Sequence, residues 1–377
     1  MTTTDEPGSA AGKGDRAIPR SSGGSPVVNG DLVALIGTTT RLYADCLMPN
    51  GALVEAPAHL PFFPKHARDT LRCRPGLDAA FAIVAMDAFG RDVRAPLLRW
   101  IRDRAAGFAD DGLLRRAYHV HGPIADEAPD LLGTALLLYA VTRRPSRARA
   151  EVVQEVSRGL ASALAVRWDG EHGRFRDLAP TDGVFRAAEL AAVGGALAAA
   201  GTALDIAEWS RLADNIASQV EHAPPESVTE PLPAGDRDES VVAYLVLAWP
   251  FAAPGTGADA ALAAERLMGA RDVTAPVLDH SEHGPLVTSD AVRPAELFWL
   301  AVGLAAAGQR ERALPYVNLG MATADASGHF PERGDPVKLG SSPRPYLLAH
   351  LLFVVAAEAV GLLAALPRGA YSGSRRP

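Results

Sequence analysis

The chain of 377 residues carries a formal net charge of -7, and 48% of its residues are hydrophobic. This composition supplies enough apolar material for one large core or two smaller ones. The mild acidity argues against a nucleic-acid-binding protein, because phosphate binding needs clustered Lys and Arg, and here Arg is interspersed with Asp and Glu.

The two ends of the chain differ from the rest. Residues 1–26 are rich in Gly, Ser, Thr and charged residues, and residues 367–377 look like a frayed tail. We expect both to be disordered, because such segments have too little apolar surface to pack. The N-terminal stretch MTTTDEPGSAAGKGDR also lacks the apolar segment of a signal peptide, which predicts a cytoplasmic protein. Residues 27–366 are expected to form a single domain.

Helices are indicated by Ala and Leu at helical spacing, in pairs separated by short turns that often contain Gly. The expected pairs are Pro75–Phe89 with Arg91–Ala106, Asp130–Val141 with Ser146–Val166, Phe185–Ala200 with Ala203–Val220, Ser240–Phe251 with Ala258–Gly269, and Pro294–Ala307 with Arg310–Ala324. Gly90, Gly201 and Gly308 are expected to break three of these pairs. A last helix, Pro345–Leu366, has Asp31–Cys46 as its expected partner.

Residues 346–366, YLLAHLLFVVAAEAVGLLAAL, are about long enough to cross a bilayer. However, this stretch contains His350 and Glu358, and nothing else in the chain looks similar. We therefore predict a buried helix in a large helical core, and no membrane partner.

Strand signals are weak, with little alternation of polar and apolar residues and 6% aromatics. Successive helical hairpins of similar length indicate either a solenoid or a closed toroid. No repeat consensus of the common solenoids is visible. Segments such as LAAVGGALAAA and LLFVVAA have almost no polar face, as inner helices of a toroid require. We predict an all-α protein with an (α/α)6 toroid.

In such a toroid the loops at one end build the pocket, so the candidate residues are polar residues in the longer loops. Arg68 and Asp69 follow PFFP and precede a helix, and an Arg-Asp pair can bind vicinal sugar hydroxyls. An ordinary surface ion pair is the alternative. Asp238 lies in DRDE before an apolar helix, where favourable interaction with the helix N-terminus is a sufficient structural reason for an acidic residue.

Two further loops carry carboxylates. The segment WDGEHGRFRD holds Asp169, Glu171 and Asp177 near Trp168 and a Phe, and a general acid needs a carboxyl beside apolar groups that raise its pKa. A charged turn is the alternative. In GHFPER, Glu332 sits between Pro and Arg in a rigid loop, where it can activate a water as a general base. A salt-bridged loop carboxylate is the alternative there.

Cysteine and histidine patterns give no cofactor or metal site. Cys46 and Cys73 are too few for a disulfide scaffold and are predicted to be separate reduced thiols, with a disulfide between them as the alternative. The histidine pairs are His119 with His121, and His280 with His283. Neither pair has partners at metal-ligand spacing, and no phosphate-binding Gly loop or dinucleotide fingerprint is present.

The collinear order of these segments resembles the family 15 glycoside hydrolases, the glucoamylase, glucodextranase and bacterial trehalase group of the six-hairpin glycosidases. The resemblance runs from about Phe62 to Leu363. Its segments are FFPKHARD with PGLDAAFAIVAMDAFG, PDLLGTALLLYAV, DRDESVVAYLVLAWPF, RPAELFWLAVGLAAAGQRERAL, FPER and YLLAHLLFVVAAEA. The family's general acid lies in a Trp-Glu-Glu motif. The matching segment here is Phe175-Arg176-Asp177, so Arg stands where the acid belongs.

The resemblance implies an (α/α)6 barrel, a pocket for a terminal α-linked glucose and an inverting mechanism. It makes Arg68 and Asp69 sugar-binding and Glu332 the base, with the acid roughly 6.5–9.5 Å from the base so that a water fits between them. Asp177, or Glu171 upstream, is left as the candidate acid. Trp168 and Asp238 are further candidates for substrate binding.

The leading hypothesis is a glycoside hydrolase that acts on a small α-glucoside, with no cofactor and a small carbohydrate as its partner. A second is a barrel that has lost hydrolysis and serves as a carbohydrate-binding or assembly protein, which Arg176 favours. A third is a class II terpene-cyclase-like barrel, because DRDES faintly resembles the Asp-X-Asp-Asp motif of those enzymes. Convergence of Arg68, Asp69, Asp177 and Glu332 on one pocket would support the first hypothesis.

Overall fold

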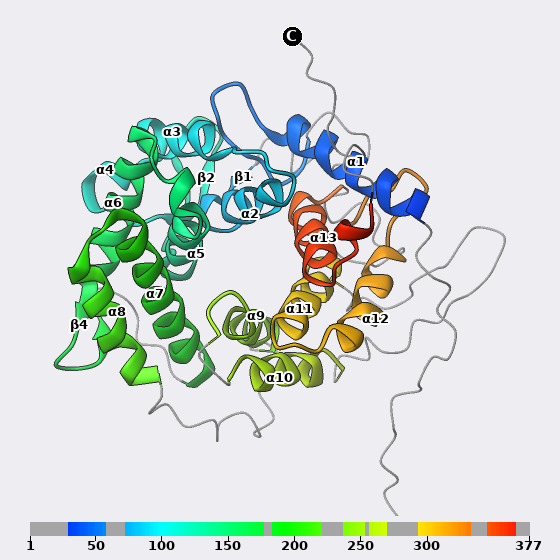
Figure 1. The fold of residues 1–377 in the computed structure, drawn as a ribbon. Coiled ribbons are helices and arrows are strands. Elements are labelled where there is room, and N and C mark those ends of the chain that lie inside the picture. The colour runs from blue at the N-terminus through cyan, green and yellow to red at the C-terminus, as the bar shows by residue number, and fades with distance from the viewer. Residues whose placement is uncertain are drawn as a thin grey trace, which may run out of the picture.

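The computed structural model describes residues 29–57, 72–176, 183–220, 237–252, 256–269, 293–332 and 345–366. In these residues the long helices alternate along the chain between an outer and an inner ring (Figure 1). The outer helices are α1 (Asn29–Cys46), α3 (Arg94–Arg104), α6 (Glu151–Arg167), α8 (Ala207–Val220), α10 (Gly257–Gly269) and α12 (Arg310–Met321). The inner helices are α2 (Ala80–Ala88), α5 (Leu131–Thr142), α7 (Gly183–Leu204), α9 (Arg237–Ala248), α11 (Pro294–Ala306) and α13 (Leu347–Ala359).

The inner ring is closed. Each inner helix contacts the next one along the chain, and α13 returns to contact α2. Helix α1 contacts α13, as the predicted pairing of the first and last helices requires. The predicted all-α (α/α)6 toroid is therefore confirmed (Figure 1).

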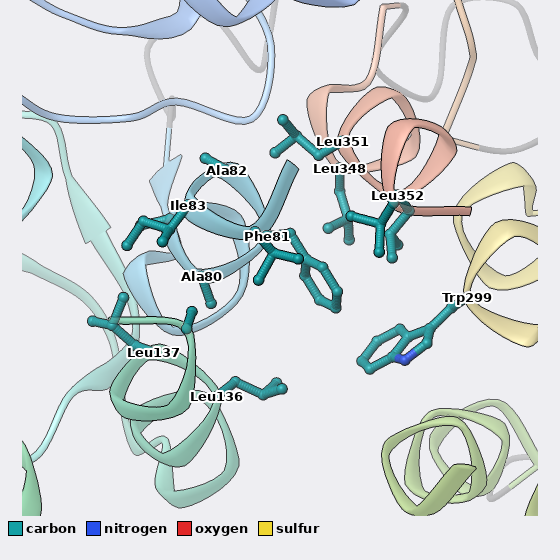
Figure 2. Packing of buried hydrophobic residues seen from close by; sticks show 14 of the residues in the cluster. Ala80, Phe81, Ala82, Ile83, Leu136, Leu137, Trp299, Leu348, Leu351 and Leu352 are labelled. Carbon is teal, nitrogen blue, oxygen red and sulfur yellow. The ribbon is translucent and has the colours of Figure 1, made fainter. Parts of the chain in front are cut away.

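Apolar residues on every face explain why the inner helices occupy the centre. All residues of α11 from Pro294 to Leu304 are buried, and so are those of α13 from Leu347 to Ala357. Figure 2 shows side chains from several inner helices facing one another across the ring. Phe81 of α2 packs edge-to-face on Trp299 of α11, with ring centroids 4.9 Å apart.

Two helices have a composition that would also suit a membrane. Residues 346–366 contain α13, which is a buried helix of the core, as predicted. Among the described helices, α7 is the one that is long and apolar enough to cross a bilayer. Within this fold it belongs to the inner ring between α5 and α9, a position that accounts for its apolar composition.

Several predicted helix ends are wrong. The helix expected from Ser146 begins at Glu151, after a short 3-10 turn, Pro145–Arg147. Helix α7 continues through Gly201, and the chain turns at Asp205, whose φ is 55°. A Cβ at Gly201 would lie 2.4 Å from Oγ of Ser210, so this glycine allows close packing of α7 on α8 and does not end the helix. Helix α13 ends at Ala359, ahead of Gly361 with φ 83°, and a short 3-10 turn, Leu363–Ala365, follows it.

Short strands precede three of the inner helices. β1 (Arg72–Cys73), β2 (Arg115–His119) and β3 (Ile124–Pro129) form an antiparallel sheet in the order β1-β2-β3. β4 (Trp168–Asp169) and β5 (Arg174–Phe175) form a hairpin. These strands were not predicted, because strands this short contain too few residues to show alternation.

A buried ion pair holds the helices together where α2 ends. Asp87 in the last turn of α2 is 2% exposed and accepts two hydrogen bonds from Arg94 of α3, at 2.9 and 2.7 Å. The Nε of Arg94 also donates to the carbonyl of Val141 in α5 at 3.1 Å. This pair therefore ties α2, α3 and α5 at the end of the ring where the inner helices finish.

Candidate active site

The inner helices all begin at the same end of the ring, because the chain reverses direction between each outer helix and the next inner one. The segments that lead into them come from distant parts of the sequence. β1 leads into α2, β3 leads into α5, and the loop after α12 leads toward α13. Polar side chains in these segments can therefore meet at one end of the barrel, as the sequence analysis expected.

Arg74 gathers three oxygen-bearing side chains at this end. Its Nε and Nη2 donate to the two carboxylate oxygens of Asp78 at 3.2 and 3.1 Å. The same Nη2 donates to the hydroxyl of Tyr346 at 2.8 Å and lies 3.4 Å from Oε2 of Glu55. We call these four residues the Arg74 hub. It joins the loop after α1 to the beginnings of α2 and α13.

Local sequence explains how Arg74 and Asp78 come to face each other. Pro75 occupies the first position of a π-helical turn, Pro75–Ala79, that opens into α2. Proline suits that position because its missing N–H would be unpaired there in any case. The backbone N–H of Asp78 donates to the carbonyl of Arg74 at 2.8 Å, which brings the two side chains onto one side of the turn.

The hub is largely shielded from solvent and combines one cation with two carboxyl groups. Asp78 is fully buried, and the Arg74 side chain is 24% exposed. Burial lowers the pKa of Arg74, but Asp78, Tyr346 and Glu55 outweigh it, so its pKa is raised and it stays charged. Burial raises the pKa of Glu55 against the opposing charge of Arg74, and it also raises the pKa of Tyr346. The arrangement holds a fixed cation and hydrogen-bonding oxygens close together, bonded to one another.

Asp130 is a further carboxylate near the hub. It caps α5, and its Oδ1 accepts from the N–H of Gly133 at 2.8 Å. A Cβ at Gly76 would lie 2.6 Å from Cα of Gly133 and 2.7 Å from Oδ2 of Asp130, so two glycines let α2 and α5 begin in close contact. Burial raises the pKa of Asp130 to about 6, while the Gly133 N–H and the charge of Arg74 act in the opposite direction.

The structure brings Glu332 to this site. Phe330, two residues before it, accepts a hydrogen bond at its carbonyl from the N–H of Tyr346 at 2.9 Å. Glu332 is partly buried, and its charge contributes to the raised pKa of both Glu55 and Tyr346. Of the predicted site residues, Glu332 is thus the one that the described structure places beside the hub.

The β4–β5 hairpin has its own network. Trp168 is 8% exposed, packs on Phe175 with ring centroids 5.3 Å apart, and donates its indole N–H to Asn215 of α8 at 3.0 Å. Trp168 thus joins the hairpin to α8, and its predicted role in sugar binding stays a prediction.

The carboxylates of the same hairpin differ in their surroundings. Asp169 accepts from the N–H of Glu171 at 3.2 Å and lies 3.0 Å from Nδ1 of His172 and 3.5 Å from Nε of Arg176. Glu171 is exposed at the tip of the hairpin and has none of the apolar surroundings that a general acid needs. Arg176, which occupies the expected acid position, is engaged with Asp169 and largely exposed.

Several predicted residues are not described. Arg68, Asp69 and Asp177 lie outside the described residues, as do both tails, His280 and His283. Asp238 falls in the first turn of α9, where only its backbone is described. The predicted convergence of Arg68, Asp69, Asp177 and Glu332 therefore stays a prediction. Cys46 and Cys73 are buried free thiols, as predicted. Among the described residues, no group of three or more His, Cys, Asp or Glu side chains is arranged to hold a metal ion.

The residues that sequence reasoning missed are Glu55, Arg74, Asp78, Asp130 and Tyr346. An available signal was the spacing of Arg74 and Asp78 around a helix start with Pro75 at its first position. Glu55 carries no local signal, because it lies in a separate loop before Arg74, and the link of Tyr346 to Arg74 depends on ring closure between α13 and α2.

In sequence comparison, no family model and no curated protein matches the chain. Several solved structures match it in fold. A wild-type glycosidase is 19% identical to this chain, and a glycosidase variant in complex with glucose is 18% identical. Each of these two matches covers 92% of this chain and 100% of the glycosidase chain, with a TM-score of 0.60. A D-mannose isomerase, 14% identical, covers 91% of this chain and 100% of its own with a TM-score of 0.54. A bacterial glucoamylase complexed with acarbose, also 14% identical, covers 88% of this chain and 56% of its own with a TM-score of 0.56.

The likeness at these identities shows the fold: the chain has a six-hairpin glycosidase-like (α/α)6 barrel. Because glycosidases and an isomerase share this architecture, the fold does not decide the chemistry. The function has to be argued from the side chains at the end of the barrel where the inner helices begin.

Proposed function

We propose that the protein is a glycoside hydrolase of the glucoamylase and trehalase type that cleaves a small α-glucoside with inversion. The observation that carries the proposal is the position of Glu332 beside the Arg74 hub. The fold likeness to glycosidases, one of them in complex with glucose, supports the substrate class.

In this mechanism the hub binds the terminal sugar and Glu332 removes a proton from the attacking water. Arg74 and Tyr346, which are hydrogen-bonded to each other at 2.8 Å, are the hub residues proposed to contact the sugar. A carboxylate in a rigid loop at the mouth of a barrel suits the role of base. A second carboxyl must protonate the leaving oxygen from the opposite side, and Asp177 is the proposed acid on the basis of the family resemblance.

The test compares the parent protein with Glu332→Gln, which keeps the shape of the side chain and removes the proton acceptor. Glu311→Gln is the matched control, because Glu311 is an exposed residue of the outer helix α12. On a panel of α-glucosides, trehalose and maltooligosaccharides, we expect Glu332→Gln to lower kcat by about 10²–10⁴-fold and the control to match the parent. Proton NMR of the first product formed should show the anomer opposite to that of the substrate.

Two outcomes would contradict the proposal. One is a Glu332→Gln variant as active as the parent, which would remove Glu332 from the mechanism. The other is a parent that leaves every glucoside intact but converts free glucose or mannose into another sugar, which would place the protein with the isomerase that shares its fold.

A further inference from the structure

His350 connects the predicted base loop to the core of the barrel. It lies in the first turn of α13 and is fully buried. Its Nε2 accepts the backbone N–H of Phe330 at 3.0 Å, and its Nδ1 lies 3.1 Å from Oγ1 of Thr39 in α1. Because Nε2 acts as an acceptor, the ring is neutral and its proton is on Nδ1, which donates to Thr39.

A buried imidazole with both nitrogens bonded is a rigid support. Thr39 is fully buried as well, so water cannot replace either of the two hydrogen bonds. Burial lowers the pKa of His350 to about 3, with a further lowering from His329, so the ring stays neutral over the range in which most enzymes work. The acceptor at Nε2 is therefore present at any such pH.

Phe330 is held on several sides. Its N–H is bound by His350, and its carbonyl accepts from the N–H of Tyr346 at 2.9 Å. Its ring packs against His350 and Phe353, with centroids 4.6 and 5.4 Å away. The next residue, Pro331, is buried and its ring restricts the backbone, so the fixed position of Phe330 carries over to Glu332.

We propose that His350 and Thr39 are positioning residues that hold Phe330, and through it Glu332, against the Arg74 hub. The inference rests on the proposed function for the role of Glu332. It adds a role for the side chains of two core residues that are fully buried. An error of about 1 Å in the placement of a catalytic group can lower a rate by about 10²-fold, so such a support has a measurable effect.

Three variants separate positioning from general stability. His350→Phe keeps the ring volume and leaves the Phe330 N–H without an acceptor. His350→Gln offers a carbonyl oxygen in place of Nε2 and serves as the conservative rescue. Thr39→Val removes only the partner of Nδ1 and carries the test if His350→Phe does not fold. Val354→Ala is the control. Val354 is buried in the same helix but takes no part in the hydrogen bonds and ring contacts described for Phe330.

Two measurements on the full chain decide the matter. Hydrogen–deuterium exchange should show faster exchange confined to residues 325–332 in His350→Phe, and unchanged exchange there in Val354→Ala. In kinetics, His350→Phe should lower kcat by about 10²-fold and Thr39→Val by about tenfold, each with KM within about threefold of the parent, and His350→Gln should recover part of the loss.

The exchange measurement does not depend on activity. Unchanged exchange at residues 325–332 in His350→Phe would overturn the inference, whether or not the parent hydrolyses glucosides. Equal losses of kcat in His350→Phe and Val354→Ala would also overturn it, because the effect would then be one of general stability. A parent without hydrolysis would reject the proposed function, and the exchange result would still decide whether His350 holds the loop.

Discussion

The buried ion pair between Arg74 and Asp78 predicts a large loss of stability in Arg74→Met. Methionine keeps much of the apolar stem and removes the cation that forks onto Asp78 at 3.2 and 3.1 Å. Breaking a buried pair by removing one partner costs about 3–5 kcal/mol, because the remaining charge is left uncompensated. The Arg74 side chain is 24% exposed, and solvent screening therefore places the expected loss near the lower end, about 3 kcal/mol.

The loss in Arg74→Met should depend on pH. Burial raises the pKa of Asp78, and the variant lacks the guanidinium that opposes this effect. A carboxyl whose pKa is higher in the folded than in the unfolded protein loses its stabilising contribution as pH rises through the folded-state pKa. The loss should therefore be larger at pH 8 than at pH 5, as measured by urea unfolding followed by tryptophan fluorescence.

A double variant provides the control. Arg74→Met with Asp78→Asn removes both charges and should recover more than half of the loss at pH 8. Equal losses at the two pH values, or a double variant that is less stable than Arg74→Met alone, would refute the view that Arg74 is retained to balance a buried carboxylate.

Three other predictions concern stability. Asp130 has a pKa raised from 3.8 to about 6, so the wild type should lose up to about 3 kcal/mol of unfolding free energy as pH rises from 4 to 7. Asp130→Asn keeps the cap and should not show this loss. If urea unfolding gives the same difference in stability between the two proteins at both pH values, the prediction is wrong. Gly76→Ala should lower the melting temperature by several degrees because its Cβ would meet Gly133 Cα at 2.6 Å, whereas Gly37→Ala, with its nearest neighbour at 3.7 Å, should match or exceed the wild type. Phe81→Ala should cost about 3–5 kcal/mol of unfolding free energy through a central cavity, and a loss under 1 kcal/mol would show that this part of the core is loosely packed.

The helices could be predicted from the sequence because inner and outer helices of a toroid have distinct compositions. Inner helices such as α11 and α13 are apolar on all sides, and short turns separate the pairs. The end of α7 was missed because Gly201 resembles a helix terminator, whereas in the structure it makes room for Ser210. A glycine that permits contact and a glycine that ends a helix look the same in a sequence.

The site was predictable only in part, for a related reason. Glu332 lies in a loop whose Pro and Arg neighbours mark it, and the described structure places it beside the hub. Tyr346 lies far from Arg74 in the sequence, and only closure of the ring brings the two together. A hydrogen bond across a closed ring leaves no local pattern, so sequence reasoning had no means to find it.

The same physics explains why the fold is clear in structure while no family model matches the sequence. Most of the ring is specified by apolar side chains, and volume-conserving exchanges among such residues usually cost little stability. Sequence identity in the helices can therefore fall while the ring persists. Residues with a defined polar partner, such as Arg74, Asp78 and His350, cannot be exchanged in this way. Loss of one partner would leave a buried polar group unpaired. Substitutions at these positions therefore test how much the barrel depends on its polar contacts, whereas the assay of the parent and of Glu332→Gln tests hydrolysis.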